Sequence, residues 1–295
     1  MVKVQVTVTP SEAKRLIAKA VSQMPIVRSA LGNGKIMLKG GTTVSAVAEE
    51  LASIKLKISG RITNLGTKSA KIISVGSHRV LLECGQVKDI ESDSALEEAF
   101  LAMGKNDLVI TGANALDVNR RAAIMVGHPL GGQAKPLPFF AVRGIPTIIA
   151  VGWEKLIPGT IDQAMMAAGR DTVDVAMGMA VGLIPLFGTV VTETDAVSML
   201  ADVKTTVIGA GGVTGGEGST TFVIEGERSN VEKAWEVVSS VKGAATSGVP
   251  ESLVECEPKD ARCSSHMTVG KTHIVLHRNC IYRQPGLART VFPKK

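Results

Sequence analysis

Segments with the pattern of a β-strand and segments with the periodicity of a helix alternate along the first 200 residues of this chain. The series begins at residues 2–8, where hydrophobic and polar residues alternate as in a strand. Thr9, Pro10 and Glu12 follow in the order of a helix start, with Thr as N-cap and Pro at the first helical position. Strands that alternate with helices form a mostly parallel sheet with helices on its faces. The sequence therefore predicts an α/β fold.

The other predicted elements continue this alternation. Strands are expected at residues 35–39, 71–75, 79–82, 108–110 and 147–151, and helices at residues 13–24, 44–51, 93–103 and 161–168. Residues 175–192 are uncharged but contain Pro185, and they are shorter than the ~20 residues that span a membrane. We expect a buried helix that runs into a loop there.

The pattern changes after about residue 200. Strands are expected at residues 205–208, 220–225 and 253–256, and a helix at residues 229–241, with Ser229 as N-cap. This order suggests a small α+β subdomain of ferredoxin-like type. The chain is therefore divided into an α/β domain (residues 1–198), the small subdomain (199–258) and a basic C-terminal tail (259–295).

Positive charge is concentrated at the two ends of the chain. Residues 1–40 contain seven Lys and Arg and one acid, and residues 266–295 contain six and none. Such ends can hold phosphates, nucleic acid or a neighbouring subunit. Nucleic acid is not the expected partner, because only 3% of the residues are aromatic and base stacking needs aromatic side chains. Four cysteines make no disulfide framework, and no signal peptide is visible. We expect a cytoplasmic protein without a membrane span and leave self-association open.

The first candidate ligand-binding motif lies between the strand at residues 35–39 and the helix that follows it. Gly40 and Gly41 allow a ligand to approach the backbone, and Thr42, Thr43 and Ser45 add hydroxyl groups. The N-terminus of a helix has unpaired N–H groups and a partial positive charge. The motif is therefore a candidate cradle for a phosphate or carboxylate group. The alternative is an ordinary strand-to-helix turn capped by Thr.

The second candidate motif is the end of the strand that starts after Asp107. It reads Thr111-Gly112-Ala113-Asn114. Ligands of open parallel sheets collect at the carboxyl ends of the strands, so this motif and the first are expected to face one crevice. Gly112, Ala113 and Asn114 are its candidate ligand-binding residues.

The order of these segments resembles a superfamily that includes ribose-5-phosphate isomerase, glucosamine-6-phosphate deaminase and class I CoA-transferases. The sugar-phosphate sensor domains of DeoR-type repressors and the regulatory subunits of translation initiation factor 2B also belong to it. Residues 39–51 are similar to its phosphate loop, residues 107–117 to its strand end D-x-x-x-x-G-x-D, and residues 144–155 to a later strand that ends near a lysine, here Lys155. The resemblance covers roughly residues 30–160. It implies an open sheet of isomerase/CoA-transferase type, a phosphorylated ligand and a binding role for Lys155.

The chain departs from this superfamily where the chemistry of its members requires acids. Ribose-5-phosphate isomerases have carboxylates in the second motif, where this chain has Thr111, Asn114 and Ala115. Proton transfer needs such groups, so that isomerase activity is not expected. CoA-transferases use a glutamate near a glycine as nucleophile. Glu83 precedes Cys84 and Gly85 and could be compared with it, but a structural Glu at a strand end is the favoured interpretation.

Four further features have less specific patterns. The loop at residues 209–218 holds six glycines but precedes a strand, so it is a loop that could close over an anion rather than a dinucleotide fingerprint. His128 is a candidate acid–base in a glycine-rich loop. Glu193 and Asp195 are expected in a solvated loop. Cysteines and histidines gather irregularly in the tail and could bind a metal or be unrelated. They are Cys256, Cys263, His266, His273, His277 and Cys280.

These observations favour a protein that binds a small anionic, phosphorylated metabolite in a crevice between residues 40–45 and residues 112–114. One alternative is an enzyme that acts on this ligand by isomerisation or by acyl or CoA transfer. Another is a non-catalytic regulatory or assembly subunit. The sequence identifies no catalytic residue, cofactor or metal.

Overall fold

The computed structural model describes most of the chain. The described residues are 1–69, 75–127, 135–254, 266–269, 272–275, 280, 286 and 290–291. Within them, no helix is long and apolar enough to cross a membrane.

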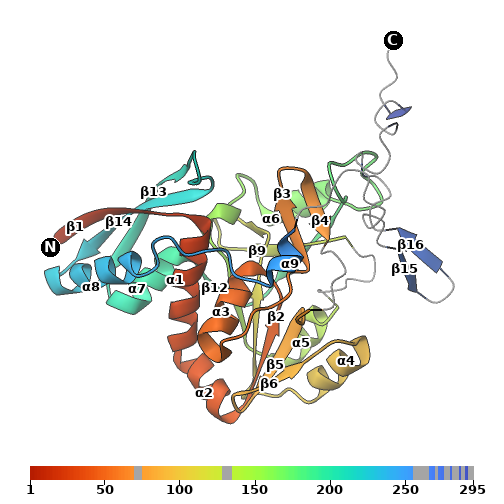
Figure 1. The fold of residues 1–295 in the computed structure, drawn as a ribbon, viewed down its shortest axis with the longest axis horizontal. Coiled ribbons are helices and arrows are strands. Elements are labelled where there is room, and N and C mark those ends of the chain that lie inside the picture. The colour runs from red at the N-terminus through yellow and green to blue at the C-terminus, as the bar shows by residue number, and fades with distance from the viewer. Residues whose placement is uncertain are drawn as a thin grey trace.

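A six-stranded sheet forms the centre of the protein (Figure 1). Its strand order is β12 (Thr189–Val191), β10 (Thr147–Ala150), β7 (Leu108–Gly112), β2 (Lys35–Lys39), β5 (Arg79–Glu83) and β6 (Gln86–Asp89). The first four strands are parallel, and β5 and β6 add to β2 as an antiparallel hairpin. The predicted α/β fold is confirmed, with a mixed sheet.

Helices cover both faces of this sheet. On one face lie α1 (Pro10–Gln23), α2 (Pro25–Asn33) and α3 (Thr42–Ala52), and on the other lie α4 (Asp93–Leu101) and α5 (Leu137–Arg143). Alternate side chains of β2 pack against the helices on opposite faces of the sheet, because successive side chains of a strand point to opposite sides. Ile36 and Leu38 pack with α1 and α3, whereas Met37 packs with Phe100 and Phe140.

The start of α1 follows the predicted capping pattern. The hydroxyl of Thr9 accepts the backbone N–H of Glu12, and the carboxylate of Glu12 accepts the backbone N–H of Thr9 at 2.8 Å. This capping box satisfies two helix N-terminal donors. It fixes the first turn of the helix that lies between the two main sheets (Figure 1).

The second sheet has three antiparallel strands, β1 (Val2–Val8), β14 (Ser219–Gly226) and β13 (Lys204–Gly211). It is covered by α7 (Glu193–Ala201) and α8 (Arg228–Ser239), and Phe222 and Ile224 are fully buried beneath them. Because β1 pairs with β14, the first strand belongs to the small sheet and not to the six-stranded sheet. Residues of the predicted domain 1–198 and the predicted subdomain 199–258 therefore share one core.

Several local predictions differ from the structure. Residues 175–192 form no helix, since Gly182 and Pro185 lie in β11 (Gly182–Leu186), which pairs with β9 (Ala122–Val126) and, through it, β8 (Ala115–Leu116). Ser229 is not an N-cap, because α8 begins at Arg228. Leu253, the first residue of the predicted strand at residues 253–256, is instead the last residue of a short helix, α9 (Pro250–Leu253), and residues 255–256 lie outside the described residues.

A hairpin and two short helices complete the described elements of the first 200 residues. They are the hairpin of β3 (Gly60–Thr63) and β4 (Gly66–Ser69), the short helix η2 (Trp153–Lys155) and α6 (Ile161–Ala167). No strand was expected at the positions of this hairpin. In the tail, β15 (His266–Val269) pairs with β16 (Thr272–Val275).

Candidate functional site

A cavity of about 340 Å³ lies at the carboxyl ends of β2 and β7. It brings together eight of the nine residues that the sequence analysis selected for ligand binding. These are Gly40, Gly41, Thr42, Thr43, Gly112, Ala113, Asn114 and Lys155. The ninth, Ser45, is fully buried and its hydroxyl accepts the backbone N–H of Leu56 at 2.9 Å, so its role is structural.

The turn from β2 into α3 needs both of its glycines. A Cβ atom at Gly40 would lie 2.5 Å from the carbonyl oxygen of His78, which already accepts the Gly40 N–H at 2.8 Å. Gly41 has a φ of +155° and is the N-cap of α3. Because this N-cap provides no side-chain hydrogen bond, no side chain of the turn caps the first N–H groups of α3. Thr42 and Thr43 line the cavity at this helix end.

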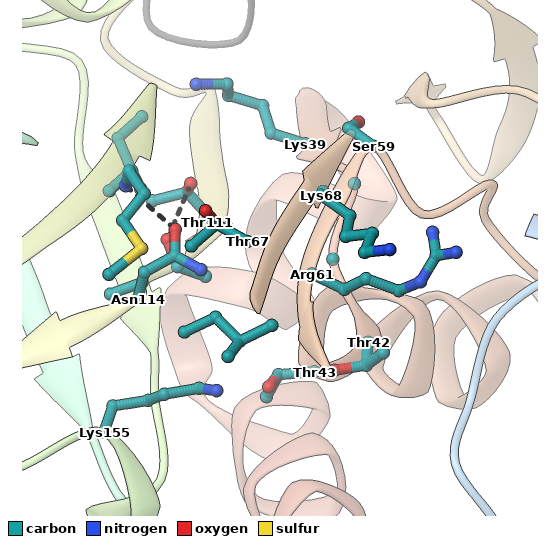
Figure 2. Close-up of a pocket in the computed structure, with 18 of the residues that line it drawn as sticks. Lys39, Thr42, Thr43, Ser59, Arg61, Thr67, Lys68, Thr111, Asn114 and Lys155 are labelled. Carbon is teal, nitrogen blue, oxygen red and sulfur yellow. Dashed lines mark hydrogen bonds between the residues drawn. The ribbon is translucent and has the colours of Figure 1, made fainter. Parts of the chain in front are cut away.

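The hairpin of β3 and β4 forms the opposite wall of the cavity and was missed by the sequence analysis. It contributes Arg61, Ile62, Thr67 and Lys68. Figure 2 shows Arg61 and Lys68 on one side of the cavity and Lys155 and Asn114 on the other. The sequence signal for this hairpin is a turn pattern, Asn64-Leu65-Gly66, between two short polar segments.

Contacts with two distant segments hold this hairpin in place. The backbone N–H of Met179 donates to the carbonyl of Thr67 at 2.7 Å. The guanidinium of Arg61 donates to the carbonyl of Ser252 at 3.0 Å, which attaches α9 to the hairpin. Segments that are distant in sequence therefore close the wall that carries Arg61 and Lys68.

The lining of the cavity is basic. Five basic side chains line it, and among the described residues no carboxylate does. The basic side chains are Lys14, Lys39, Arg61, Lys68 and Lys155. Burial lowers the pKa of Lys155, which Glu154 partly offsets. In Figure 2 the ammonium of Lys155 points toward Thr43, at the start of α3. The wall with Lys155 thus combines an ammonium, a hydroxyl and a helix N-terminus.

A buried carboxylate lies behind this wall. Glu193 is fully buried at the start of α7, so the expectation of a solvated loop is wrong. Its carboxylate accepts the backbone N–H of Trp153 at 3.0 Å. Burial, together with the nearby Glu154, raises the pKa of Glu193 to about 7. Glu154 in turn pairs with Lys14, a cavity residue, at 3.4 Å.

Asn114 of the second motif and the nearby Asp117 both make structural hydrogen bonds. The side-chain oxygen of Asn114 accepts the backbone N–H of Met125 at 3.0 Å, which fixes the Asn114 side chain at the edge of the cavity. Asp117 is fully buried and accepts backbone N–H groups from Asn119, Arg121 and Ile161. Burial alone would raise its pKa, but these hydrogen bonds lower it. Asp117 organises the loop and does not line the cavity.

The remaining candidates lie elsewhere. Glu83 pairs with Lys35 and Lys88 at the end of β2 that is opposite to Gly40, as expected of a structural Glu. Asp195 accepts the backbone N–H of Thr192 at 2.8 Å and completes the cap of α7. The glycine-rich loop begins within β13, and its Gly218 lies against Pro10 and near Glu154, outside the cavity lining.

The His and Cys candidates are only partly covered by the structure. His128, Cys256, Cys263 and His277 lie outside the described residues, and His266 and His273 lie in β15 and β16. Cys280 is a buried free cysteine. Within the described ranges, no group of three or more His, Cys, Asp or Glu side chains could hold a metal ion.

The fold and the cavity define an α/β protein with a basic crevice at the carboxyl edge of a mixed sheet. No protein-family model, no curated protein and no solved structure matches the chain. The function is therefore inferred from the chemistry of the cavity.

Proposed function

We propose that this protein binds a small phosphorylated metabolite in the cavity between α3 and the hairpin of β3 and β4. The observation that carries the proposal is the charge of the lining, with five basic side chains and, among the described residues, no carboxylate. A lining of one charge sign in a concave, low-dielectric site concentrates ligands of the opposite sign. The resemblance to the isomerase and CoA-transferase superfamily supports the same ligand class, and with it a sheet of that type and a ferredoxin-like subdomain.

The phosphate group is best accommodated at the start of α3. The N–H groups of the first helical turn, the hydroxyls of Thr42 and Thr43 and the ammonium of Lys155 converge there (Figure 2). Helix N-termini bind phosphate through such N–H groups and the helix dipole. Each hydrogen bond to the charged group contributes about 1.5–3 kcal/mol. Arg61 and Lys68 face the rest of the ligand from the hairpin.

Two alternatives concern the fate of the bound ligand. Acyl transfer through Glu83 is not favoured, since Glu83 lies at the other end of β2. A regulatory or assembly role without turnover uses the same cavity and predicts binding alone. We place the protein in the cytoplasm, where phosphorylated metabolites are formed.

Thermal unfolding with phosphorylated and dephosphorylated forms of the same metabolites tests the proposal. A ligand at a hundred times its Kd adds about 2.7 kcal/mol to the free energy of unfolding. The phosphorylated forms should stabilise the protein, and the T42A/T43A variant should lose at least about tenfold in affinity, as expected for 1.4 kcal/mol or more. Stabilisation by neither form would refute the proposal.

The matched control is the T7A/T221A variant. Thr7 and Thr221 hydrogen-bond to each other at 2.8 Å on the exposed face of the small sheet, away from the cavity. This variant also loses two threonine hydroxyls, and it should bind with unchanged affinity. Equal loss in both variants would assign the effect to stability rather than to the cradle.

A further inference from the structure

Lys39 is a buried basic side chain with no visible counter-charge. It is the last residue of β2, it lines the cavity, and it is 2% exposed. No described residue accepts a hydrogen bond from its ammonium nitrogen. Burying an unpaired ammonium costs several kcal/mol, so a side chain in this position tends to be neutral.

Arg79, the neighbour of Lys39 on the adjacent strand, makes the protonated form of Lys39 even less favourable than burial alone does. Lys39 and Arg79 are register partners in β2 and β5, and Arg79 adds a second positive charge. Burial first, and then Arg79, lower the pKa of Lys39 to about 7. An amine with a pKa near neutrality is unprotonated in a substantial fraction of the molecules at pH 7. A desolvated lysine beside a cationic group is one of the standard arrangements of a nucleophilic amine.

The position of Lys39 in the cavity complements that of the phosphate cradle. On its other side its register partner is Thr111, at the end of β7. In Figure 2, Lys39 lies beyond Thr111 and Asn114, whereas Thr43 and Lys155 lie on the opposite side of the cavity. A ligand held by its phosphate at α3 must therefore extend across the cavity to reach Lys39.

We propose that Lys39 forms an imine with a carbonyl group of the bound ligand, which makes the ligand a phosphorylated aldehyde or ketone. This inference rests on the proposed phosphate site. The amine nitrogen attacks the carbonyl carbon, and a proton passes from nitrogen to oxygen to give a carbinolamine. The nitrogen lone pair then forms the C=N bond as the C–O bond breaks, and the hydroxyl leaves as water with the remaining N–H proton, so that amine and carbonyl become imine and water. The step needs no oxidant or reductant. Lys39 is thereby the nucleophile that holds the ligand covalently.

Reductive trapping in the full-length protein tests this proposal. The probes are dihydroxyacetone phosphate and erythrose 4-phosphate, whose carbonyl groups do not form stable cyclic hemiacetals. Glycerol 3-phosphate is the matched probe without a carbonyl. Each is incubated with the protein and cyanoborohydride, and the modified peptide is located by mass spectrometry. We expect up to one adduct per chain, on Lys39, from the carbonyl probes alone. Excess inorganic phosphate should reduce its yield at least tenfold.

Lys14, Lys68 and Lys155 line the same cavity and serve as internal controls, with at least tenfold less modification expected. The Lys39→Met variant should form no adduct with either carbonyl probe. Because the wild-type map locates the adduct, the test does not depend on the folding of this variant. Probes that stabilise the protein but leave Lys39 unmodified, or that modify another lysine instead, would overturn the imine and leave the phosphate site standing. If no probe binds, both proposals fail.

Discussion

The carboxylate of Glu12 accepts hydrogen bonds from the ammonium of Lys242 at 2.7 Å and from the backbone N–H of Gly243 at 2.8 Å. The same side chain closes the capping box with Thr9. One buried carboxylate therefore fixes the start of α1 and attaches it to the chain that follows α8. Burial alone would raise the pKa of Glu12, but Lys242 and the two backbone donors outweigh it and lower the pKa.

Replacing Glu12 should cost more stability than removing the cap alone. Glu12→Ala leaves three donors without their acceptor, and we expect a loss of about 2–3 kcal/mol in the free energy of unfolding. Thr9→Ala removes the N-cap hydroxyl and should cost about 1 kcal/mol. Urea unfolding measures both. Equal losses would mean that the contacts to Lys242 and Gly243 contribute nothing.

Glu193 makes stability depend on pH near neutrality. Its pKa is raised from 4.5 to about 7, so the folded state keeps the proton while the unfolded chain releases it. The resulting stabilisation is complete below pH 4.5 and is lost as pH rises through about 7, a decrease of about 3 kcal/mol. Glu193→Gln cannot ionise and should remove this part of the pH dependence. Urea unfolding between pH 5 and pH 8 measures it.

An exposed glutamate provides the control for this experiment. Glu232→Gln on α8 removes the same charge from the surface, and it should leave the pH dependence as in the wild type. A Glu193→Gln protein whose stability falls with pH as steeply as the wild type would show that Glu193 is not the group responsible.

Local patterns in the sequence were enough to locate much of the fold. The capping box at Thr9 and Glu12 and the bounds of β2 depend on neighbouring residues only, and both are as predicted. The partner of β1 depends on a pairing with a strand more than 200 residues later, which periodicity does not encode. Glu193 was misjudged for the same reason, because its burial comes from the segments that pack over α7.

In the candidate site, too, some features follow from neighbouring residues and others depend on distant contacts. The glycine-threonine turn and the end of β7 have chemical signatures of their own, so they could be selected from the sequence. Arg61 and Lys68 lie in a short polar hairpin that looks like surface loop. Only its attachment to Met179 and Ser252 turns it into a cavity wall. Lys39 was visible as the end of a strand, but its burial beside Arg79 is a property of the sheet.

Replacing Arg79 should change the pKa of Lys39 and therefore the reactivity of its amine. Arg79→Gln removes the second cause of the lowered pKa and keeps the first, which is burial. The pKa of Lys39 should therefore rise from about 7 but stay below its ordinary value of 10.5. Competitive acetylation as a function of pH, read at Lys39 by mass spectrometry, measures the midpoint. Asp93, which pairs with Arg79 at 3.5 Å, is mostly exposed and remains hydrated in the variant.

Arg28→Gln, on the exposed side of α2, is the control for this change in charge. It should leave the midpoint of Lys39 acetylation unchanged. A midpoint that moves equally in both variants would attribute the shift to overall charge, and one that moves in neither would remove Arg79 from the explanation.

The cavity wall formed by β3 and β4 depends on a glycine in a distant segment. Gly178 has a φ of +84°, and a Cβ atom there would fall onto the backbone of Thr67 in β4. Gly178→Ala must therefore displace the hairpin that carries Arg61 and Lys68. We expect a loss of about 1–3 kcal/mol in stability and at least about tenfold in affinity for a phosphorylated ligand.

Gly85 separates the two causes of this loss. It has a similar φ of +78° in the turn between β5 and β6, but a Cβ atom there would meet no neighbour within 4 Å. Gly85→Ala therefore adds the backbone strain without the collision, about 1 kcal/mol, and should leave affinity unchanged. Urea unfolding and ligand titration of both variants make the comparison. If the Gly178→Ala protein binds as tightly as the Gly85→Ala protein, the position of the hairpin does not determine affinity, and Arg61 and Lys68 are not part of the binding site.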